Sequence, residues 1–395
     1  MRDANNVLDF TSPVDSTSPE SKPYAWFHCA SLGEYEQAVP VIESYLSKNP
    51  LTPILLTFFS PSGFTPITTT SPPKWLRPQD KIAALPLDTP TAVRKFLKSP
   101  GLKVKFFATC KYEVWPVLQN ELSKSKIPSF VFAAHFSHTA PALKDNFVGR
   151  FLISAWHTFD KIFTQDESSS ELLKAHGINS LSVGDPRADR VLHLAEEPAS
   201  KVMTELMSWK GNSRVVLAGS SWPADESALA LCSWDSETKL IIAPHEVDSA
   251  HITNILDKFN TAAPKIASKL SNGPPSPESS VLIIDSIGLL SSLYALADLA
   301  VIGGGFGAGI HNLLEPAAFS VPMVSGPNIA RFREAHALKS IGALQVAPSI
   351  EELSVLIKDL LTTQNSSQIK NSGRSAKSWL LEQRGASEKI TSYLP

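Results

Sequence analysis

Short apolar runs recur along the chain, and each ends at a turn of small or polar residues before a helical pattern begins. In the first half, the runs predicted to be strands cover residues 24–30, 53–59, 104–109, 129–134, 161–165 and 181–184. In the second half they cover residues 215–218, 240–243, 281–285, 299–302 and 321–325. Strands that alternate with helices indicate parallel sheets with helices on both faces, so we predict an α/β fold.

The alternation restarts in the middle of the chain, which divides the sequence into two similar halves. We predict a polar, disordered tail over residues 1–22, a first domain over residues 23–190 and a second domain over residues 191–395. Residues 64–79, rich in Pro and Thr, are predicted to form an irregular loop, and residues 373–394 a helix. Two joined halves imply a cleft between them, which is a usual place for a ligand.

The strongest local signal is a glycine-rich segment in the second half. The strand at residues 299–302 leads into five glycines within residues 303–309, and His311, Asn312 and Glu315 are predicted to open a helix. Backbone N–H groups at such a helix N-terminus suit a phosphate, and Glu315 is placed to accept hydrogen bonds from sugar hydroxyls. An ordinary glycine-rich turn fits the same pattern.

Two better-known phosphate-binding motifs do not match this segment. The P-loop ending in Gly-Lys-Ser/Thr is absent. A relaxed dinucleotide-binding match at Gly303, Gly305 and Ala308 lacks the acidic residue expected about 20 positions further on. A nucleotide bound here would therefore be held in a different manner.

Polar residues follow many of the predicted strands. Because carboxyl ends of parallel strands share one edge, where ligands bind in open α/β sheets, these residues are candidates for a site. Each also has a structural alternative, such as capping a helix or completing a turn. They are Glu34, Ser62, Asp88, Glu113, His135, Arg187, Ser220 and His245.

Composition narrows the classes of function. The 395 residues carry a net charge of −2, which gives no support to nucleic-acid binding. Three widely spaced cysteines argue against a disulfide framework, and neither Asp-x-Asp nor His-Glu-x-x-His occurs, so we predict no metal site. No apolar run approaches the ~18 residues of a membrane span, which leaves a peripheral membrane role open.

Seven stretches, in order along the chain, resemble the motifs of the 3-deoxy-D-manno-octulosonic acid (Kdo) transferases, in wording most like the Bacteroidetes branch. One motif alone is weakly specific, but the ordered set covers the chain from Trp26 to its C-terminus. The stretches are residues 26–34 (WFHCASLGE), 85–88 (LPLD), 112–116 (YEVWP), 184–189 (GDPRAD), 218–222 (AGSSW), 243–246 (APHE) and 303–316.

The resemblance implies a GT-B fold, in which two Rossmann-like domains face each other across an interdomain cleft. It implies a metal-independent glycosyltransferase, without a cofactor, that moves Kdo from CMP-Kdo to a lipid A precursor (lipid IVA) with inversion. This step belongs to lipopolysaccharide core biosynthesis, at the cytoplasmic face of the bacterial inner membrane, and implies a peripheral membrane protein. The single phosphate of CMP-Kdo agrees with the missing carboxylate pair for Mg²⁺.

The resemblance also implies roles for particular residues. Glu34 matches the general base and Glu113 a residue that holds the active-site geometry or the acceptor, so both are predicted to be catalytic. Arg187 is predicted to meet negative charge on the donor. The predicted substrate-binding set is completed by Gly33, Ser62, Ser220, Pro244, His245, Gly304, Gly305, Asn312 and Glu315.

The sequence departs from the family in three places. The segment before the first strand is polar, where many members carry a hydrophobic anchor. Many members have Arg at the position of His135 or Ser137, so an anionic contact is in doubt. The loop over residues 64–79 is longer than expected, and its aromatic residues, with Phe58 and Phe59, fit either lipid contact or a core.

Two other hypotheses remain open. Another GT-B enzyme would use a different nucleotide sugar, for instance a UDP donor. A non-catalytic module would bind a nucleotide sugar or a lipid on the same scaffold.

Overall fold

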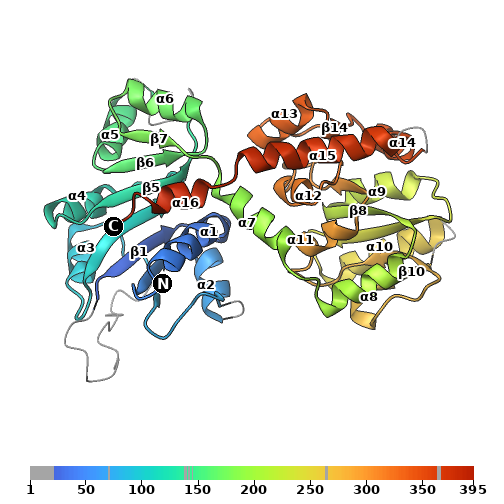
Figure 1. The fold of residues 1–395 in the computed structure, drawn as a ribbon, viewed down its shortest axis with the longest axis horizontal. Helices are drawn as coiled ribbons and strands as arrows, with labels where there is room; N and C mark the ends of the chain where they lie inside the picture. Colours follow the sequence, from blue (N-terminus) through green and yellow to red (C-terminus); the bar gives the residue numbers. More distant parts are fainter. Residues whose placement is uncertain are drawn as a thin grey trace. The chain divides into compact units, whose positions relative to one another are not determined.

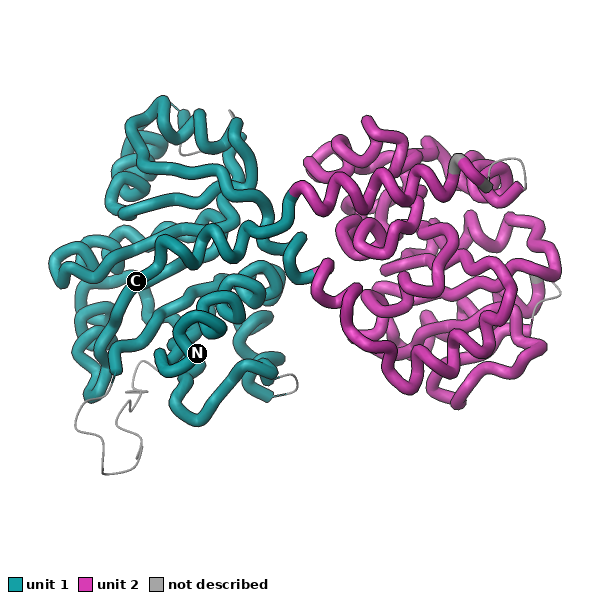
Figure 2. Tube along the Cα trace, in the orientation of Figure 1, with its two compact units in different colours: residues 1–190, 383–395 teal, residues 191–382 magenta. Residues whose placement is uncertain are grey.

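The computed structural model describes residues 22–69, 72–137, 140, 143–144, 146–262, 266–362 and 366–395. They form two compact units, shown in different colours in Figure 2. The first unit comprises the chain up to Arg190 together with Gln383–Pro395, and the second is Val191–Glu382. The tail expected over residues 1–22 lies, except for Lys22, outside the described residues.

The first unit is built on a seven-stranded parallel sheet in the order β3-β2-β1-β4-β5-β6-β7 (Figure 1). The central strand β1 is buried along its whole length, as expected for a sheet covered on both faces. The strands are β1 (Tyr24–Cys29), β2 (Ile54–Phe58), β3 (Lys81–Ala84), β4 (Val104–Cys110), β5 (Ser129–Ala134), β6 (Lys161–Thr164) and β7 (Ser180–Ser182).

Helices cover both faces of this sheet. Side chains alternate between the faces, so Phe27 joins one core and its neighbour Trp26 the other. The core around Phe27 lies under α1 (Leu32–Lys48), α2 (Pro61–Thr69) and α16 (Ala386–Thr391). The core around Trp26 lies under α3 (Pro90–Leu97), α4 (Pro116–Lys124), α5 (Phe147–Trp156) and α6 (Glu167–Ala175).

The second unit repeats the plan with a parallel sheet in the order β10-β11-β9-β8-β12-β13-β14 (Figure 1). Its strands are β8 (Arg214–Ser221), β9 (Thr238–Pro244), β10 (Ile266–Lys269), β11 (Ser279–Ile283), β12 (Leu299–Ile302), β13 (Met323–Ser325) and β14 (Leu344–Val346). One core of this unit places Leu229, Phe259 and Ile357, from three helices, against the central strands.

The remaining helices connect these strands, and α7 also links the two units. They are α7 (Pro186–Glu196), α8 (Lys201–Lys210), α9 (Pro223–Leu231), α10 (Ser249–Ala262), α11 (Leu290–Leu293), α12 (Leu314–Ala318), α13 (Arg333–Ser340), α14 (Ile350–Leu360) and α15 (Ser366–Glu382). Two short 3₁₀ helices, η2 (Leu270–Asn272) and η3 (Tyr294–Leu296), lie before β11 and β12.

The prediction of an irregular loop over residues 64–79 is wrong for the first part of this segment. Residues 64–69 continue the helix α2, which begins at Pro61. The Ser60 carbonyl accepts hydrogen bonds from the N–H groups of Gly63 and Phe64, and Ile67 enters the core. Tertiary burial of one face thus outweighs the poor helix propensity of a Pro- and Thr-rich segment.

The prediction that the second domain covers residues 191–395 is wrong at the C-terminal end. The helical pattern expected over residues 373–394 breaks at Gly385, which has a φ of 91°. After the break, α16 packs on α1, and the Tyr45 hydroxyl donates to the Pro395 carbonyl at 2.9 Å. Asp189 accepts hydrogen bonds from the N–H groups of Gly385 and Ser387, so the last thirteen residues belong to the first unit.

Candidate active site

In the first unit, Glu34 lies at the turn from β1 to α1, as the sequence predicts. It is the third residue of α1, after Ser31 at the N-cap. Its Oε2 accepts a hydrogen bond from the Ala30 N–H at 2.5 Å, which fixes the carboxylate against the end of β1. A carboxylate near a helix N-terminus is also favoured by the helix dipole.

Glu34 has a carboxylate neighbour in Glu113, which follows β4. Burial raises the pKa of Glu34, although the Ala30 N–H and the charge of Lys111 lower it in part. Burial, and then the charge of Glu34, raise the pKa of Glu113 to about 6. Two partly buried carboxyl groups with raised pKa values, one of which acts on the other, are typical of acid–base sites.

Arg187, expected to meet charge on a donor, belongs to the first unit. The Arg187 guanidinium binds the Asp185 carboxylate, with Nη2 to Oδ2 at 2.7 Å. The backbone N–H of Arg187 donates to Asp185 Oδ1 at 2.9 Å. Burial raises the pKa of the Tyr112 phenol, and the charges of Arg187 and Glu34 act on it as well. Arg187 therefore lies within the electrostatic surroundings of Glu34, with part of its charge balanced by Asp185.

The other predicted site residues of the first unit are of two kinds: some are accessible, and some have structural hydrogen bonds. Gly33 has open space where a Cβ would lie, and Ser62 is exposed at the start of α2, bonded to the Ser60 hydroxyl at 2.9 Å. Asp88 caps α4 by accepting hydrogen bonds from two of its N–H groups. His135 is bonded through Nδ1 to the Asp166 carboxylate at 2.8 Å.

The structure decides the alternatives for the aromatic residues near the loop. Phe58 is fully buried, and Phe64 and Trp75 pack against the core, so these three are not surface residues for lipid. Phe59 is 36% exposed and stacks at a tilt on Trp115, with ring centroids 4.7 Å apart.

In the second unit, the end of β8 and the glycine-rich segment lie against each other. Ser220 has a φ of 51° at an irregularity in the pairing of β8 with β9. A Cβ on Gly303 would lie 2.0 Å from the Ser220 carbonyl oxygen, and one on Gly305 would lie 2.5 Å from the Gly326 nitrogen. Gly304 has a φ of 88°. These glycines are therefore required by close backbone approach and by backbone conformation.

The helix predicted to open at His311 begins later. Residues 303–311 form a turn, in which the N–H groups of Gly309 and His311 donate to the carbonyls of Gly304 and Gly303. The helix α12 starts at Leu314 and has five residues, and the Asn312 Oδ1 accepts from the Leu314 N–H at 2.9 Å. The prediction that the helix opens at His311 is therefore wrong by three residues, and the phosphate site at its N-terminus stays a prediction.

Three rings stack beside this turn. The His245 ring contacts those of Trp222 and His311, with centroid distances of 4.8 and 4.6 Å. The Trp222 Nε1–H donates to His311 Nε2 at 3.1 Å, so a neutral His311 carries its hydrogen on Nδ1. Burial, followed by the proximity of His245, lowers the pKa of His311, which favours that neutral form. Pro244, at the end of β9, is buried next to His245.

Sequence reasoning missed Asp225, a buried carboxylate in the first turn of α9. Its Oδ2 accepts hydrogen bonds at 3.0 Å from the N–H groups of Trp222 and Gly304, so it ties the helix start to the glycine turn. Burial raises the pKa of Asp225. An acidic residue in the first helical turn, two positions after Pro223, was the available signal, whereas the bond to Gly304 has none in the sequence.

Glu315 lies half-buried in the short helix α12. Burial raises the pKa of the Tyr294 hydroxyl, and the charge of Glu315 adds to this effect. The Tyr294 hydroxyl lies close to Gly219, since a Cβ added to Gly219 would be 2.2 Å from the hydroxyl oxygen. Glu315 is therefore near the end of β8, on the side of the unit that carries Ser220.

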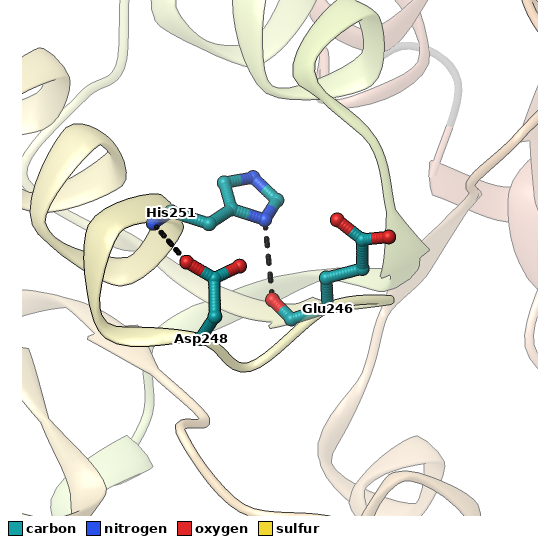
Figure 3. A group of neighbouring side chains, drawn as sticks. All are labelled: Glu246, Asp248 and His251. Atoms are coloured by element: carbon teal, nitrogen blue, oxygen red, sulfur yellow. Dashed lines mark hydrogen bonds between the residues drawn. The ribbon is translucent and has the colours of Figure 1, made fainter.

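Glu246, Asp248 and His251 form a group with ligand atoms within 4.8 Å of one another (Figure 3). The backbone N–H of His251 donates to Asp248 Oδ1. In the His251 ring, Nδ1 lies 3.1 Å from the Glu246 carbonyl oxygen and Nε2 lies 3.0 Å from the buried Glu226 carboxylate. Both ring nitrogens of His251 lie within hydrogen-bond distance of oxygen atoms. These contacts explain why the three residues lie together, because they hold the turn at the start of α10.

A hollow of about 350 Å³ lies at the opposite edge of the second sheet. It is lined by residues that include Arg214 and Thr238, the first residues of β8 and β9, and by none of the predicted site residues. Separately, none of the helices in the described part of the chain combines the length and apolarity needed to cross a bilayer.

Solved structures of the same architecture define the class. The Anabaena protein HepE in complex with UDP is 12% identical, covers 94% of this chain and 99% of its own, and has a TM-score of 0.57. The trehalose-6-phosphate structure from E. coli bound with UDP-2-fluoro glucose is 11% identical, covers 94% and 98%, and has a TM-score of 0.53. The chain thus has the GT-B fold of glycosyltransferases, as predicted.

Sequence comparison finds relatives with one shared description. Residues 8–189 match the family model for 3-deoxy-D-manno-octulosonic-acid transferase (kdotransferase). The 3-deoxy-D-manno-octulosonic acid transferase of Haemophilus influenzae is 24% identical over 382 residues, which cover 93% of this chain and 86% of that protein. The corresponding protein of Aquifex aeolicus is 25% identical over 364 residues, with coverages of 90% and 91%. Over most of its length the chain is thus similar to the Kdo transferases.

Proposed function

We propose that this glycosyltransferase moves Kdo from CMP-Kdo to a lipid A precursor, with inversion at the anomeric carbon and without a metal. It would act in lipopolysaccharide core biosynthesis, as a peripheral protein at the cytoplasmic face of the inner membrane. The observation that carries the proposal is the Glu34 carboxylate, held by the Ala30 N–H beside Glu113 at a sheet edge, in a chain that is similar to the Kdo transferases.

Glu34 is the proposed general base. As the acceptor hydroxyl oxygen bonds to the anomeric carbon, Glu34 takes its proton, and the bond from that carbon to the phosphate of CMP breaks, so that CMP leaves with the electron pair. Partial burial raises the pKa of Glu34 and makes it a stronger base than an exposed carboxylate. Glu113 holds the acceptor or the geometry around Glu34.

The second unit is proposed to bind the donor. Its candidates are Ser220, Pro244, His245, Gly304, Gly305, Asn312 and Glu315, all on or beside the glycine turn and the ends of β8 and β9. Glu315 is assigned to the ribose hydroxyls. Arg187, Gly33 and Ser62 are proposed to contact substrate from the first unit.

The test is incubation with CMP-Kdo and a tetraacyl lipid A precursor, read by mass spectrometry. The wild-type protein is expected to add the mass of Kdo, and absence of any product would overturn the proposed function. Glu34→Gln is expected to reduce turnover at least about a thousandfold, because the base is lost, while CMP still raises the melting temperature. Near wild-type turnover by Glu34→Gln would remove Glu34 as the base.

A different nucleotide sugar is the alternative that the same fold accommodates. Because a ligand that binds only the folded state raises the melting temperature, thermal shifts with CMP, UMP and UDP separate the donors. A shift with CMP alone supports the CMP-Kdo proposal, and a shift with UDP alone contradicts it. Binding without turnover for any acceptor would favour a non-catalytic module.

A further inference from the structure

Exposed apolar side chains of the first unit gather at the carboxyl edge of its sheet. Leu32, Leu87 and Tyr112, which are 36%, 55% and 49% exposed, come soon after the ends of β1, β3 and β4. The helix α5 follows β5 and returns toward the start of β6, so its first turns also lie toward the carboxyl edge (Figure 1). This is the edge that carries Glu34 and Glu113.

The first turns of α5 carry the most exposed of these side chains. Phe147, Val148 and Phe151 are 87%, 59% and 53% exposed, and their spacing of i, i+1 and i+4 places them on one face of the helix. The opposite face is anchored, because Trp156 enters the core and Leu152 and Ile153 pack against it. Exposed apolar side chains that lie together mark an interaction surface, whereas single ones do not.

Basic residues accompany this face. Lys144 and Arg150 are exposed beside it, and α5 itself has no acidic residue. The helix start is fixed, since the Asn146 side chain accepts a hydrogen bond from the Gly149 N–H at 2.8 Å and Gly149 lies directly on the Lys144 backbone. Phenylalanines next to lysine or arginine are a feature of helices that lie in the interface of an anionic membrane.

We propose that the exposed face of α5 docks on a lipid bilayer with anionic headgroups. Phe147, Val148 and Phe151 enter the boundary between headgroups and acyl chains, and Lys144 and Arg150 meet the headgroup phosphates. The choice of a lipid surface rests on the proposed function, because an acylated acceptor resides in a membrane. With Phe147 87% exposed, the side chain protrudes, which suits insertion into a bilayer better than a protein groove.

The test is co-sedimentation of the full chain with vesicles of phosphatidylglycerol and phosphatidylethanolamine. The triple variant Phe147→Ser/Val148→Ser/Phe151→Ser is expected to bind at least about tenfold more weakly, because it removes most of the apolar area that would be buried. Phe147→Ser alone is expected to lose several-fold. The matched control is Ile287→Ser in the second unit, where Ile287 is 88% exposed, and its binding is expected to equal that of the wild type.

Charge is tested separately. Lys144→Glu is expected to weaken binding to these vesicles at low salt and to flatten its dependence on salt, since headgroup attraction is screened. Vesicles of phosphatidylcholine alone are expected to bind the wild type several-fold less. Equal binding to both kinds of vesicle would overturn the assignment to anionic lipid.

Further outcomes contradict the docking proposal as a whole. A wild type that stays in the supernatant, or a triple variant that sediments with vesicles as well as the wild type, overturns it. So does a wild-type dimer that the triple variant dissociates in sedimentation velocity, because the face would then bind a second copy. Melting curves check that each variant is folded. If the triple variant does not fold, the vesicle binding of Phe147→Ser decides the test instead.

Activity separates this proposal from the proposed function. The triple variant is expected to transfer Kdo normally to a detergent-dispersed acceptor and poorly to one embedded in vesicles. Equal loss with both acceptors would overturn a docking role. If the wild type makes no product at all, the transfer reaction fails, while the vesicle binding still tests the surface of α5.

Discussion

Glu34 and Glu113 show how the environment of a single residue prepares its chemistry. Both are ordinary carboxylates whose pKa values rise because they are partly buried, and Glu34 adds its charge to the effect on Glu113. An acid with a raised pKa in the folded state prefers to be protonated there. At neutral pH the ionised Glu113 therefore costs folding free energy, which is typical of a functional rather than a stabilising group.

We predict that Glu113→Gln stabilises the protein at pH 7.5 by about 1 kcal/mol, after allowance for solvent screening. The folded pKa of about 6 lies above the ordinary value, so the folded state binds more protons between these values and wild-type stability falls as pH rises through them. The gain should vanish below pH ~4, where Glu113 is protonated in both states. Urea titrations at several pH values measure it. A gain independent of pH would contradict this origin.

The glycine turn shows what a whole element requires. The turn is closed by its own backbone hydrogen bonds and fixed to α9 by Asp225, while Gly303 and Gly305 allow neighbouring backbones to approach. The turn is therefore formed by contacts with the end of β8 and with Gly326, and the five-residue helix after it contributes little. Substituting a glycine should harm the element only where a neighbour occupies the Cβ position.

Gly303→Ala and Gly33→Ala form a matched pair for this argument. The Cβ added at Gly303 would collide with the Ser220 carbonyl at 2.0 Å, so we expect a loss of at least about 2 kcal/mol of unfolding free energy. At Gly33, inside α1, the space is open and alanine is the better helix former, so we expect a gain of up to about 1 kcal/mol. Chemical denaturation compares the two. A tolerated Gly303→Ala would show that the turn can shift.

At the scale of the whole molecule, the chain crosses between its two units twice. It leaves the first unit through α7 and returns after α15, so the last residues complete the core of the first unit. Ile390 is fully buried in that core, and Asp189 holds the returning chain through Gly385 and Ser387. The stability of the first unit therefore depends on the far end of the sequence.

Ile390→Ala tests this dependence. The lost burial and the cavity should cost about 2–4 kcal/mol, and the cost should fall on the first unit. Hydrogen exchange is the measurement, with faster exchange expected in α1 and β1 and little change in residues 215–360. The exposed Lys389→Ala, also in α16, serves as control, with little effect expected. Equal loss of protection in both units would contradict an independent first unit.

The sequence by itself determined the features that repeat locally. Apolar runs bounded by turns located β5 and β12 to the residue, and they gave the α/β class and the place of Glu34 at a strand-to-helix turn. Periodicity does this because one buried run of four or more residues carries its own signal. The short edge strands β3, β10 and β14 were missed, since most of their residues are only partly buried or exposed and form no continuous buried run.

Only the tertiary structure decided which distant residues meet. The bond from Asp225 to Gly304, the return of α16 to α1 and the late start of α12 depend on partners far along the chain. It also decided that Phe58 is core and that Phe147 is surface, although both are phenylalanines in apolar runs. Burial and long-range hydrogen bonds arise from the packed chain, whereas periodicity is a property of neighbouring residues.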